Sequence, residues 1–165
     1  MQKSLSRLLL LILTVCLLGV SSLQAQKYTP DTYIEKYGPI AQELMKESGV
    51  PASVILAVAM HESAHGNSRI ANHLNNHFGI KGKNSSKKIR SAYKGYSSAM
   101  SSYEDFINLL KKRKHTTSLF DDQNKNYTSW VKAIARSGYS ATKSWSSLIL
   151  RTISRYNLDK YDSVN

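Results

Sequence analysis

A short stretch in which every residue is apolar constrains the fold of this chain more than any other feature. Residues 54–60 read Val-Ile-Leu-Ala-Val-Ala-Met, without a polar side chain on any face. A helix that is apolar all round must be surrounded by other elements. Because Pro51 precedes the run and Gly66 follows it, the sequence predicts a central buried helix that begins near Pro51 and ends near Ala64.

One carboxylate, Glu62, falls in the last turn of this predicted helix. No further Asp or Glu follows it in the chain until Glu104. Burial and the negative end of a helix both disfavour the ionised form of a carboxyl group. A carboxyl group that keeps its proton near neutral pH is what general acid catalysis requires. The alternative is a structural carboxylate at a helix end, paired with His61, His65 or Arg69.

Helical periodicity and capping residues predict further helices around the central one. The predicted helical segments are 29–49, 68–74, 98–114, 126–137 and 142–156. Between them, residues 75–79 read as a tight turn, and residues 80–96 as a small irregular β-hairpin or loop. The sequence therefore predicts an α+β, mainly helical fold with two lobes, in which a cleft separates the helical body from a short β-hairpin lobe.

The first 25 residues have the pattern of a secretory signal peptide. Lys3 and Arg7 supply a positive start, residues 8–20 form an apolar core, and the segment ends at the small residue Ala25. We expect cleavage after Ala25 and export of the rest of the chain to the periplasm or the outside of the cell.

The cysteine content and the charge are informative about the exported part, residues 26–165, which we expect to be one domain. The only cysteine is Cys16, and a lipid anchor there is a weaker alternative because no small residue precedes it. The exported part therefore has no disulfide.

The formal charge is +12, or +10 after cleavage. We expect association with an anionic cell wall or envelope, although the charge can also serve solubility alone. No nucleic-acid motif is present.

Residues 61–65 also spell His-Glu-Ser-Ala-His, the HExxH pattern of zinc proteases. In those enzymes the two histidines share one helical face and a third ligand follows. Here Ser68 stands where the extended motif has Gly, and Ala71 stands where it has the third His. No acid follows Glu62 before Glu104, and Gly66 interrupts the helix. We therefore predict no metal site, and a zinc protease is a minor alternative.

Several motifs follow in a characteristic order. Residues 62–71 read Glu-Ser-Ala-His-Gly-Asn-Ser-Arg-Ile-Ala, and residues 75–81 read Asn-Asn-His-Phe-Gly-Ile-Lys. Later come Tyr96-Ser97-Ser98, Ser102, Asp105, Gly138-Tyr139 and Trp145. In this order, across residues 32–162, the chain resembles the glucosaminidase family of peptidoglycan hydrolases, a lysozyme-like family of autolysins and flagellar muramidase domains.

The resemblance implies hydrolysis of the β-1,4 glycosidic bond after N-acetylglucosamine in peptidoglycan strands, without a cofactor. It places Glu62 as the general acid and Tyr139 beside it as a second catalytic group. The leaving sugar oxygen must be protonated as positive charge develops on the sugar ring, which explains the need for an acid. The aromatic candidates suit a hydrophobic core as well as a sugar platform. The residues expected to bind substrate or shape the cleft are Asn76, Phe78, Tyr96 and Trp145.

The second carboxylate of the family has no counterpart in the predicted hairpin. Residues 82–103 contain no Asp or Glu. Three possibilities stay open: the N-acetyl group of the substrate acts as the internal nucleophile, a distant acid such as Glu104 or Asp105 positions water, or the chain binds glycan without cleaving it. We favour assistance by the substrate, with a non-catalytic glycan-binding module as the alternative function.

Overall fold

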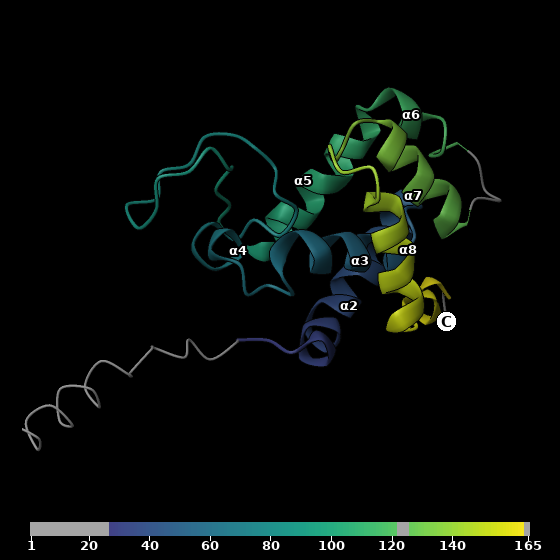
Figure 1. The fold of residues 1–165 in the computed structure, drawn as a ribbon, viewed down its shortest axis with the longest axis horizontal. Helices are drawn as coiled ribbons and strands as arrows, with labels where there is room; N and C mark the ends of the chain where they lie inside the picture. The colour runs from purple at the N-terminus through teal and green to yellow at the C-terminus, as the bar shows by residue number, and fades with distance from the viewer. Residues whose placement is uncertain (1–26, 122–125, 164–165) are drawn as a thin grey trace, which may run out of the picture.

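The computed structural model describes residues 27–121 and 126–163, and it shows a group of packed helices from which one long loop projects (Figure 1). The predicted signal peptide, residues 1–25, lies outside the described residues. No helix in the described part is long and apolar enough to cross a membrane. The elements in chain order are α2 (Pro30–Ser48), α3 (Ala52–Ser63), α4 (Arg69–Leu74), α5 (Ala99–Lys111), α6 (Lys114–Thr117), α7 (Tyr127–Arg136), α8 (Trp145–Arg155) and the 3₁₀ helix η1 (Leu158–Asp162).

Helix α3 is the centre of the fold, as its apolar sequence predicts. Every residue from Ala52 to Met60 is buried. The helix contacts α2, α7, α8 and η1, so neighbours cover it on several sides. Each fully buried Val, Leu or Ile side chain stabilises such a core by about 1.5–3 kcal/mol. The mainly helical fold is thus confirmed, and its central element supplies much of the core.

Local capping explains where α2 begins and ends. The Thr29 amide donates to the Thr32 hydroxyl at 2.9 Å, and the Thr32 amide donates to the Thr29 hydroxyl at 3.2 Å. This reciprocal pair satisfies amide groups that have no partner within the helix. At the other end, Gly49 adopts a left-handed conformation (φ 76°), and its amide donates to Met45 O at 2.8 Å.

Helix α3 is followed by three consecutive residues with left-handed backbone conformations, which end the helix. Ala64, His65 and Gly66 have φ values of 50°, 54° and 76°. Only glycine adopts this region without a steric cost, so Ala64 and His65 carry backbone strain of about 1 kcal/mol or more each. A Cβ atom at Gly66 would lie 2.9 Å from the ring of Tyr33. The chain therefore turns sharply just after Glu62.

The loop of residues 80–96 forms an arm rather than a regular hairpin. In the described residues its pairing is limited to one isolated antiparallel bridge, Lys81 with Tyr93. The Asn84 side chain donates to the carbonyl oxygens of Ser91 and Tyr93 at 2.9 and 2.8 Å, in place of a ladder. The segment is rich in Gly and Ser and has few apolar side chains to pair across strands, so extended pairing gains little. Figure 1 shows this teal arm projecting away from the helices.

Candidate active site

Four segments converge around the carboxyl group of Glu62. This side chain is half-buried in the last turn of α3. It lines a pocket of about 330 Å³ together with the turn at residues 78–81, the end of α5 and Tyr139. The two residues that the family resemblance assigned to catalysis, Glu62 and Tyr139, thus share one pocket.

The two oxygens of Glu62 have different surroundings. Oε1 accepts a hydrogen bond of 2.9 Å from Nε1 of Trp145, the first residue of α8. Oε2 lies 3.6 Å from the position of a Cβ atom built on Gly79, which also lines the pocket. An indole N–H can only donate, so it favours an acceptor oxygen at Oε1. A proton on this carboxyl group is therefore best carried by Oε2.

Gly79 sets the width of the pocket beside Glu62. Its φ of 63° lies in the left-handed region that glycine adopts at little cost. A Cβ atom there would stand between Glu62 Oε2, at 3.6 Å, and the ring of Tyr93, at 3.8 Å. The absence of a side chain at this position keeps Oε2 accessible.

Tyr139 is held in the pocket by its hydroxyl and its ring. The hydroxyl donates to the carbonyl oxygen of Phe78 at 2.7 Å, and the ring lies 5.3 Å from the ring of Trp145. Burial, and then the negative charge of Glu62, raise the pKa of Tyr139 well above its ordinary value. The phenol therefore stays neutral, and its oxygen retains lone pairs that can accept a hydrogen bond from a substrate.

Asn76 and Phe78 stabilise the turn that lines the pocket. Asn76 is 1% exposed, and its amide group donates to Ile80 O and Lys94 O, both at 2.8 Å. Its Oδ1 accepts from the amides of Phe78 and Ile80 at 3.3 and 3.2 Å. The Phe78 ring stacks on Phe106 at 4.3 Å, so Phe78 faces the core with its side chain and the pocket with its backbone.

Trp145 is buried, with 2% of its surface exposed, so its ring has no free face for a sugar. Its contact with the site is the hydrogen bond to Glu62. Tyr96 lies on the arm, half-buried, and its hydroxyl donates to Asp105. The structure thus brings Trp145 to Glu62 through its N–H and brings Tyr96 to α5.

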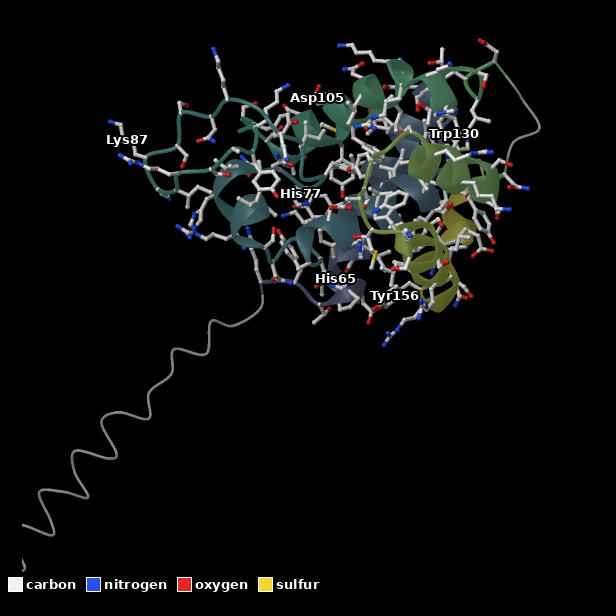
Figure 2. The ribbon with its side chains drawn as sticks, turned by 45° about the horizontal axis from the view of Figure 1, so that its top comes forward. His65, His77, Lys87, Asp105, Trp130 and Tyr156 are labelled. Carbon is white, nitrogen blue, oxygen red and sulfur yellow. The ribbon has the colours of Figure 1, made fainter. Side chains whose placement is uncertain are left out.

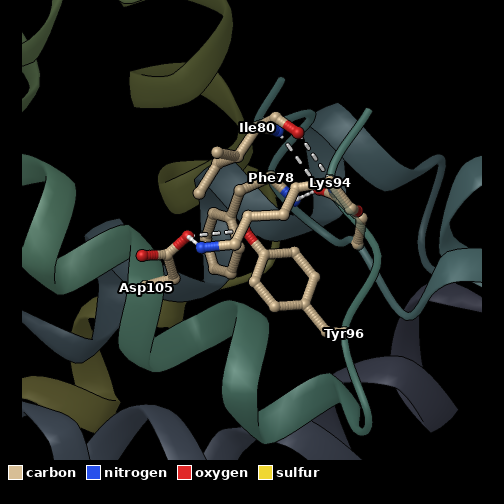
Figure 3. A network of polar contacts seen from close by, with 6 residues as sticks. Phe78, Ile80, Lys94, Tyr96 and Asp105 are labelled. Atoms are coloured by element: carbon tan, nitrogen blue, oxygen red, sulfur yellow. Dashed lines mark hydrogen bonds and ion pairs between the residues drawn. The ribbon is translucent and has the colours of Figure 1, made fainter. Parts of the chain in front are cut away.

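Of the two candidate distant acids, Asp105 is held by partners of its own (Figure 3) and Glu104 lines a different hollow. Asp105 Oδ2 accepts from Lys94 Nζ at 2.8 Å and from Tyr96 Oη at 2.7 Å. Burial alone would raise the pKa of Asp105, but the hydrogen bonds from Lys94 and Tyr96 outweigh it and hold the pKa below its usual value. Glu104 lines a separate hollow between α2 and α5. Among the described residues, Glu62 is the one carboxylate that lines its pocket.

Arg113, which the sequence did not single out, also lines the pocket of Glu62. Its Nη1 donates to Ser137 O at 2.7 Å, and its guanidinium lies 5.5 Å from the centre of the Tyr139 ring. Its buried Nε has no hydrogen-bond partner in the described part of the chain. In the sequence this arginine belongs to a basic run, Lys111 to Lys114, and only its position opposite Tyr139 distinguishes it.

The histidines of the HExxH pattern do not share a helical face. His61 lies in α3, whereas Ala64 and His65 have left-handed backbones after the helix has ended. Over residues 27–121 and 126–163, no group of three His, Cys, Asp or Glu side chains is arranged to hold a metal ion. The helical geometry on which a zinc protease depends is therefore not formed here.

Comparisons with known proteins identify the family of this sequence. Residues 38–158 match the family model Glucosaminidase, described as mannosyl-glycoprotein endo-beta-N-acetylglucosaminidase. Exo-glucosaminidase LytG of Bacillus subtilis (strain 168) is 30% identical over 154 residues, which are 81% of this chain and 54% of that protein. The chain thus spans about half the length of this curated relative.

Solved structures share the fold. The catalytic domain of the autolysin Auto from Listeria monocytogenes has a TM-score of 0.69 and 24% identity, over 86% of this chain and 92% of that one. The glycoside hydrolase domain of Salmonella typhimurium FlgJ has a TM-score of 0.64 and 21% identity, over 79% of this chain and 89% of that one. At these identities the likeness shows a shared fold.

Proposed function

The chain belongs to the glucosaminidase family, and on that premise we propose that it is an exported peptidoglycan hydrolase that cleaves the β-1,4 glycosidic bond after N-acetylglucosamine, with Glu62 as the general acid. The observation that carries the proposal is the placement of Glu62. Its Oε1 is held by Trp145, while Oε2 lies beside Gly79 in a pocket that Tyr139 also lines.

In the first step, Oε2 of Glu62 protonates the oxygen of the leaving sugar as the glycosidic bond breaks. The carboxylate that results keeps its hydrogen bond from the Trp145 N–H, and such a bond is stronger to an ionised acceptor than to a neutral one. Trp145 thus stabilises the negative charge that the proton transfer leaves behind.

The nucleophile in this proposal is the N-acetyl group of the substrate. Its carbonyl oxygen attacks the anomeric carbon, and a cyclic intermediate forms as the leaving sugar departs. Water then opens the ring and gives a proton to the Glu62 carboxylate, which restores the acid. Support comes from the pocket, where Glu62 is the one carboxylate among the described lining residues, and from Asp105, whose Oδ2 is bound by Lys94 and Tyr96.

Tyr139 orients the N-acetyl group. Its hydroxyl proton is donated to Phe78 O, which leaves the oxygen to accept a hydrogen bond from the amide N–H of the sugar. An amide held in this way points its carbonyl oxygen in one direction, and orientation of reacting groups accounts for a large part of enzymatic rate enhancement.

The cleavage is proposed to be internal to the strand, as in the description of the family, whereas the name of the curated relative indicates attack at chain ends. Digestion of purified peptidoglycan, followed by analysis of the reducing ends and of fragment length, tests both points. Long early fragments with reducing N-acetylglucosamine support the proposal, and early release of only small saccharides indicates attack at chain ends. Reducing muramic acid means a muramidase, and anhydro-muramic products mean a lytic transglycosylase.

The second candidate function is a glycan-binding module, because no acid occurs between residues 82 and 103. Binding of the purified protein to peptidoglycan without release of any reducing end would favour it. Export and association with the wall are part of the main proposal, and detection of the mature chain outside the cytoplasm tests them.

A further inference from the structure

A second hollow, of about 400 Å³, adjoins the last turn of α3. It is lined by that turn, by His65 and by one face of α8, and we call it the α8 hollow. His61, which lines it, directly precedes Glu62, which lines the pocket described above. The α8 hollow and that pocket have no lining residue in common, but both adjoin the last turn of α3.

The backbone turn after α3 creates the α8 hollow. The left-handed conformations of Ala64 and His65 direct the imidazole of His65 against Tyr156, with the ring centres 6.2 Å apart and edge to face. Figure 2 shows His65 and Tyr156 next to each other. Leu148 and Thr152 of α8 and Tyr156, which caps its C-terminal end, recur every four residues and line the hollow, because residues at this spacing share a face of a helix.

Four nitrogen-bearing side chains surround the α8 hollow. Arg151 and Arg155 lie one turn apart on α8, and His61 and His65 come from the end of α3. No Asp or Glu is among the lining residues of this hollow. The guanidinium of Arg155 lies 5.6 Å from the centre of the Tyr156 ring, and in the described structure no hydrogen bond or ion pair occupies the side-chain nitrogens of these four residues.

This arrangement favours an anion and disfavours a metal ion. Burial, and then the positive charges of Arg155 and His61, lower the pKa of His65. The same positive potential repels a metal cation, so the two histidines of the HExxH pattern do not suit zinc. A planar guanidinium presents paired N–H groups that match the two oxygens of a carboxylate or the oxygens of a phosphate.

We propose that the α8 hollow binds a carboxylate group of the peptide stem that peptidoglycan carries, and that this contact helps to position the glycan strand over Glu62. The inference rests on the proposed function, because it takes peptidoglycan as the substrate. The stem is attached to the sugar that alternates with N-acetylglucosamine, so its carboxylates lie within a short peptide of the scissile bond. A phosphate on a separate wall polymer has no such fixed relation to Glu62.

The test compares soluble glycan strands that carry their peptide stems with the same strands after an amidase has removed the stems. The double variant Arg151→Gln/Arg155→Gln removes both guanidinium groups, and both arginines are exposed, so the fold is retained. We expect KM for stem-bearing strands to rise about tenfold or more, the effect of losing a charge-assisted hydrogen bond, with kcat unchanged. On stem-free strands we expect no change.

The matched control is Lys132→Gln/Arg136→Gln. These two exposed cations have the same spacing on α7 and neither lines the α8 hollow, so the control lowers the net charge equally. An equal rise in KM for the control would show a general charge effect and overturn the inference. An unchanged KM in the double variant, or an equal rise on both substrates, would also overturn it.

Two further measurements distinguish failure of the proposed function from failure of the proposal about the α8 hollow. If the wild-type protein cleaves neither kind of strand, the proposed function fails, whereas cleavage of both with no selective loss in the double variant rejects only the α8 hollow. Free stem peptide should inhibit the wild type on stem-bearing strands and affect the double variant about tenfold less. Inorganic phosphate that inhibits as well as the peptide at equal concentration would contradict a carboxylate ligand.

Discussion

Trp145 donates from its indole nitrogen to Glu62 Oε1 across 2.9 Å, although the two residues are 83 positions apart in the chain. One comes from the start of α8 and the other from the last turn of α3. The packing of these two helices therefore fixes the direction in which the second carboxyl oxygen points. Changes at either residue should reveal whether that direction matters for glycan cleavage.

Replacement of Glu62 by Gln should abolish lysis and leave wall binding intact. The amide has the size of the carboxyl group, and its oxygen can still accept from Trp145, but it cannot donate an acidic proton. Loss of a general acid costs about 100-fold to 10,000-fold in rate. Release of reducing ends and co-sedimentation with peptidoglycan measure the two properties. Cleavage by the variant at near wild-type rate would show that another group is the acid.

Replacement of Trp145 by Phe should lower kcat. In free-energy terms this loss should exceed the fall in the free energy of unfolding. The ring stays in the core, but Oε1 of Glu62 loses its donor and the charge formed during proton transfer is stabilised less. We expect kcat to fall about tenfold or more, since a hydrogen bond to a charged group contributes roughly 1.5–3 kcal/mol. Kinetics on soluble strands and thermal unfolding are the measurements. A variant with unchanged kcat would make this contact structural only.

Replacement of Tyr139 by Phe should reduce activity and cost a little stability. The change leaves the carbonyl oxygen of Phe78 without its donor, which destabilises the fold by about 1 kcal/mol. It also removes the oxygen proposed to hold the N-acetyl group, so kcat should fall about tenfold or more. Tyr127→Phe on α7 is the control for the loss of a phenolic hydroxyl group. A fall in melting temperature without a fall in kcat would contradict the orienting role.

Acid should destabilise the protein through His77. This imidazole is 3% exposed and shares a 2.7 Å hydrogen bond with the hydroxyl of Tyr33. Burial, and then the charges of Lys27 and Lys36, lower its pKa from 6.5 to about 4. The unfolded chain therefore takes up the proton first, and the free energy of unfolding should fall by roughly 2–3 kcal/mol as the pH drops from 7 to 4.5.

Urea denaturation at several pH values measures this effect. A His77→Gln variant is less stable at neutral pH but should show a flatter profile between pH 6.5 and 4, and exposed His115 replaced by Gln should leave the profile unchanged. If the His77 variant keeps the full wild-type slope, other groups account for the loss of stability in acid.

Salt should weaken association with the wall. The chain has 23 Lys and Arg against 11 Asp and Glu, and screening shortens the range of exposed charges from about 10 Å at 0.1 M salt to about 3 Å at 1 M. Co-sedimentation with purified walls at low and high salt measures it, with neutral polysaccharide as the control. Equal binding at both salt concentrations would remove the electrostatic part of the proposal.

The helices were predictable because their signals are local. Thr29 with Pro30 marks the start of α2, Gly49 its end, and the apolar run of α3 requires a central position. The place of Glu62 at the end of α3 follows from the same pattern. The expected β-hairpin was not found as regular strands, because the Gly- and Ser-rich arm has few apolar side chains to pair across strands.

The contacts between distant segments were not predictable. For Trp145 the sequence left both a sugar platform and a place in the core open, and it gives no means to recognise a buried donor to Glu62. Arg113 lies in a basic run that reads as a solvated surface, and only folding brings it opposite Tyr139. The α8 hollow likewise depends on how α8 packs against the end of α3.

Asn76 closes the arm at its base, where its amide group joins the turn to Lys94 and the bridge between Lys81 and Tyr93 follows. Everything beyond that closure can change length at small thermodynamic cost, since doubling a flexible loop costs only about 0.6 kcal/mol. Insertions at the tip of the arm can thus add surface there without moving the turn that lines the pocket of Glu62.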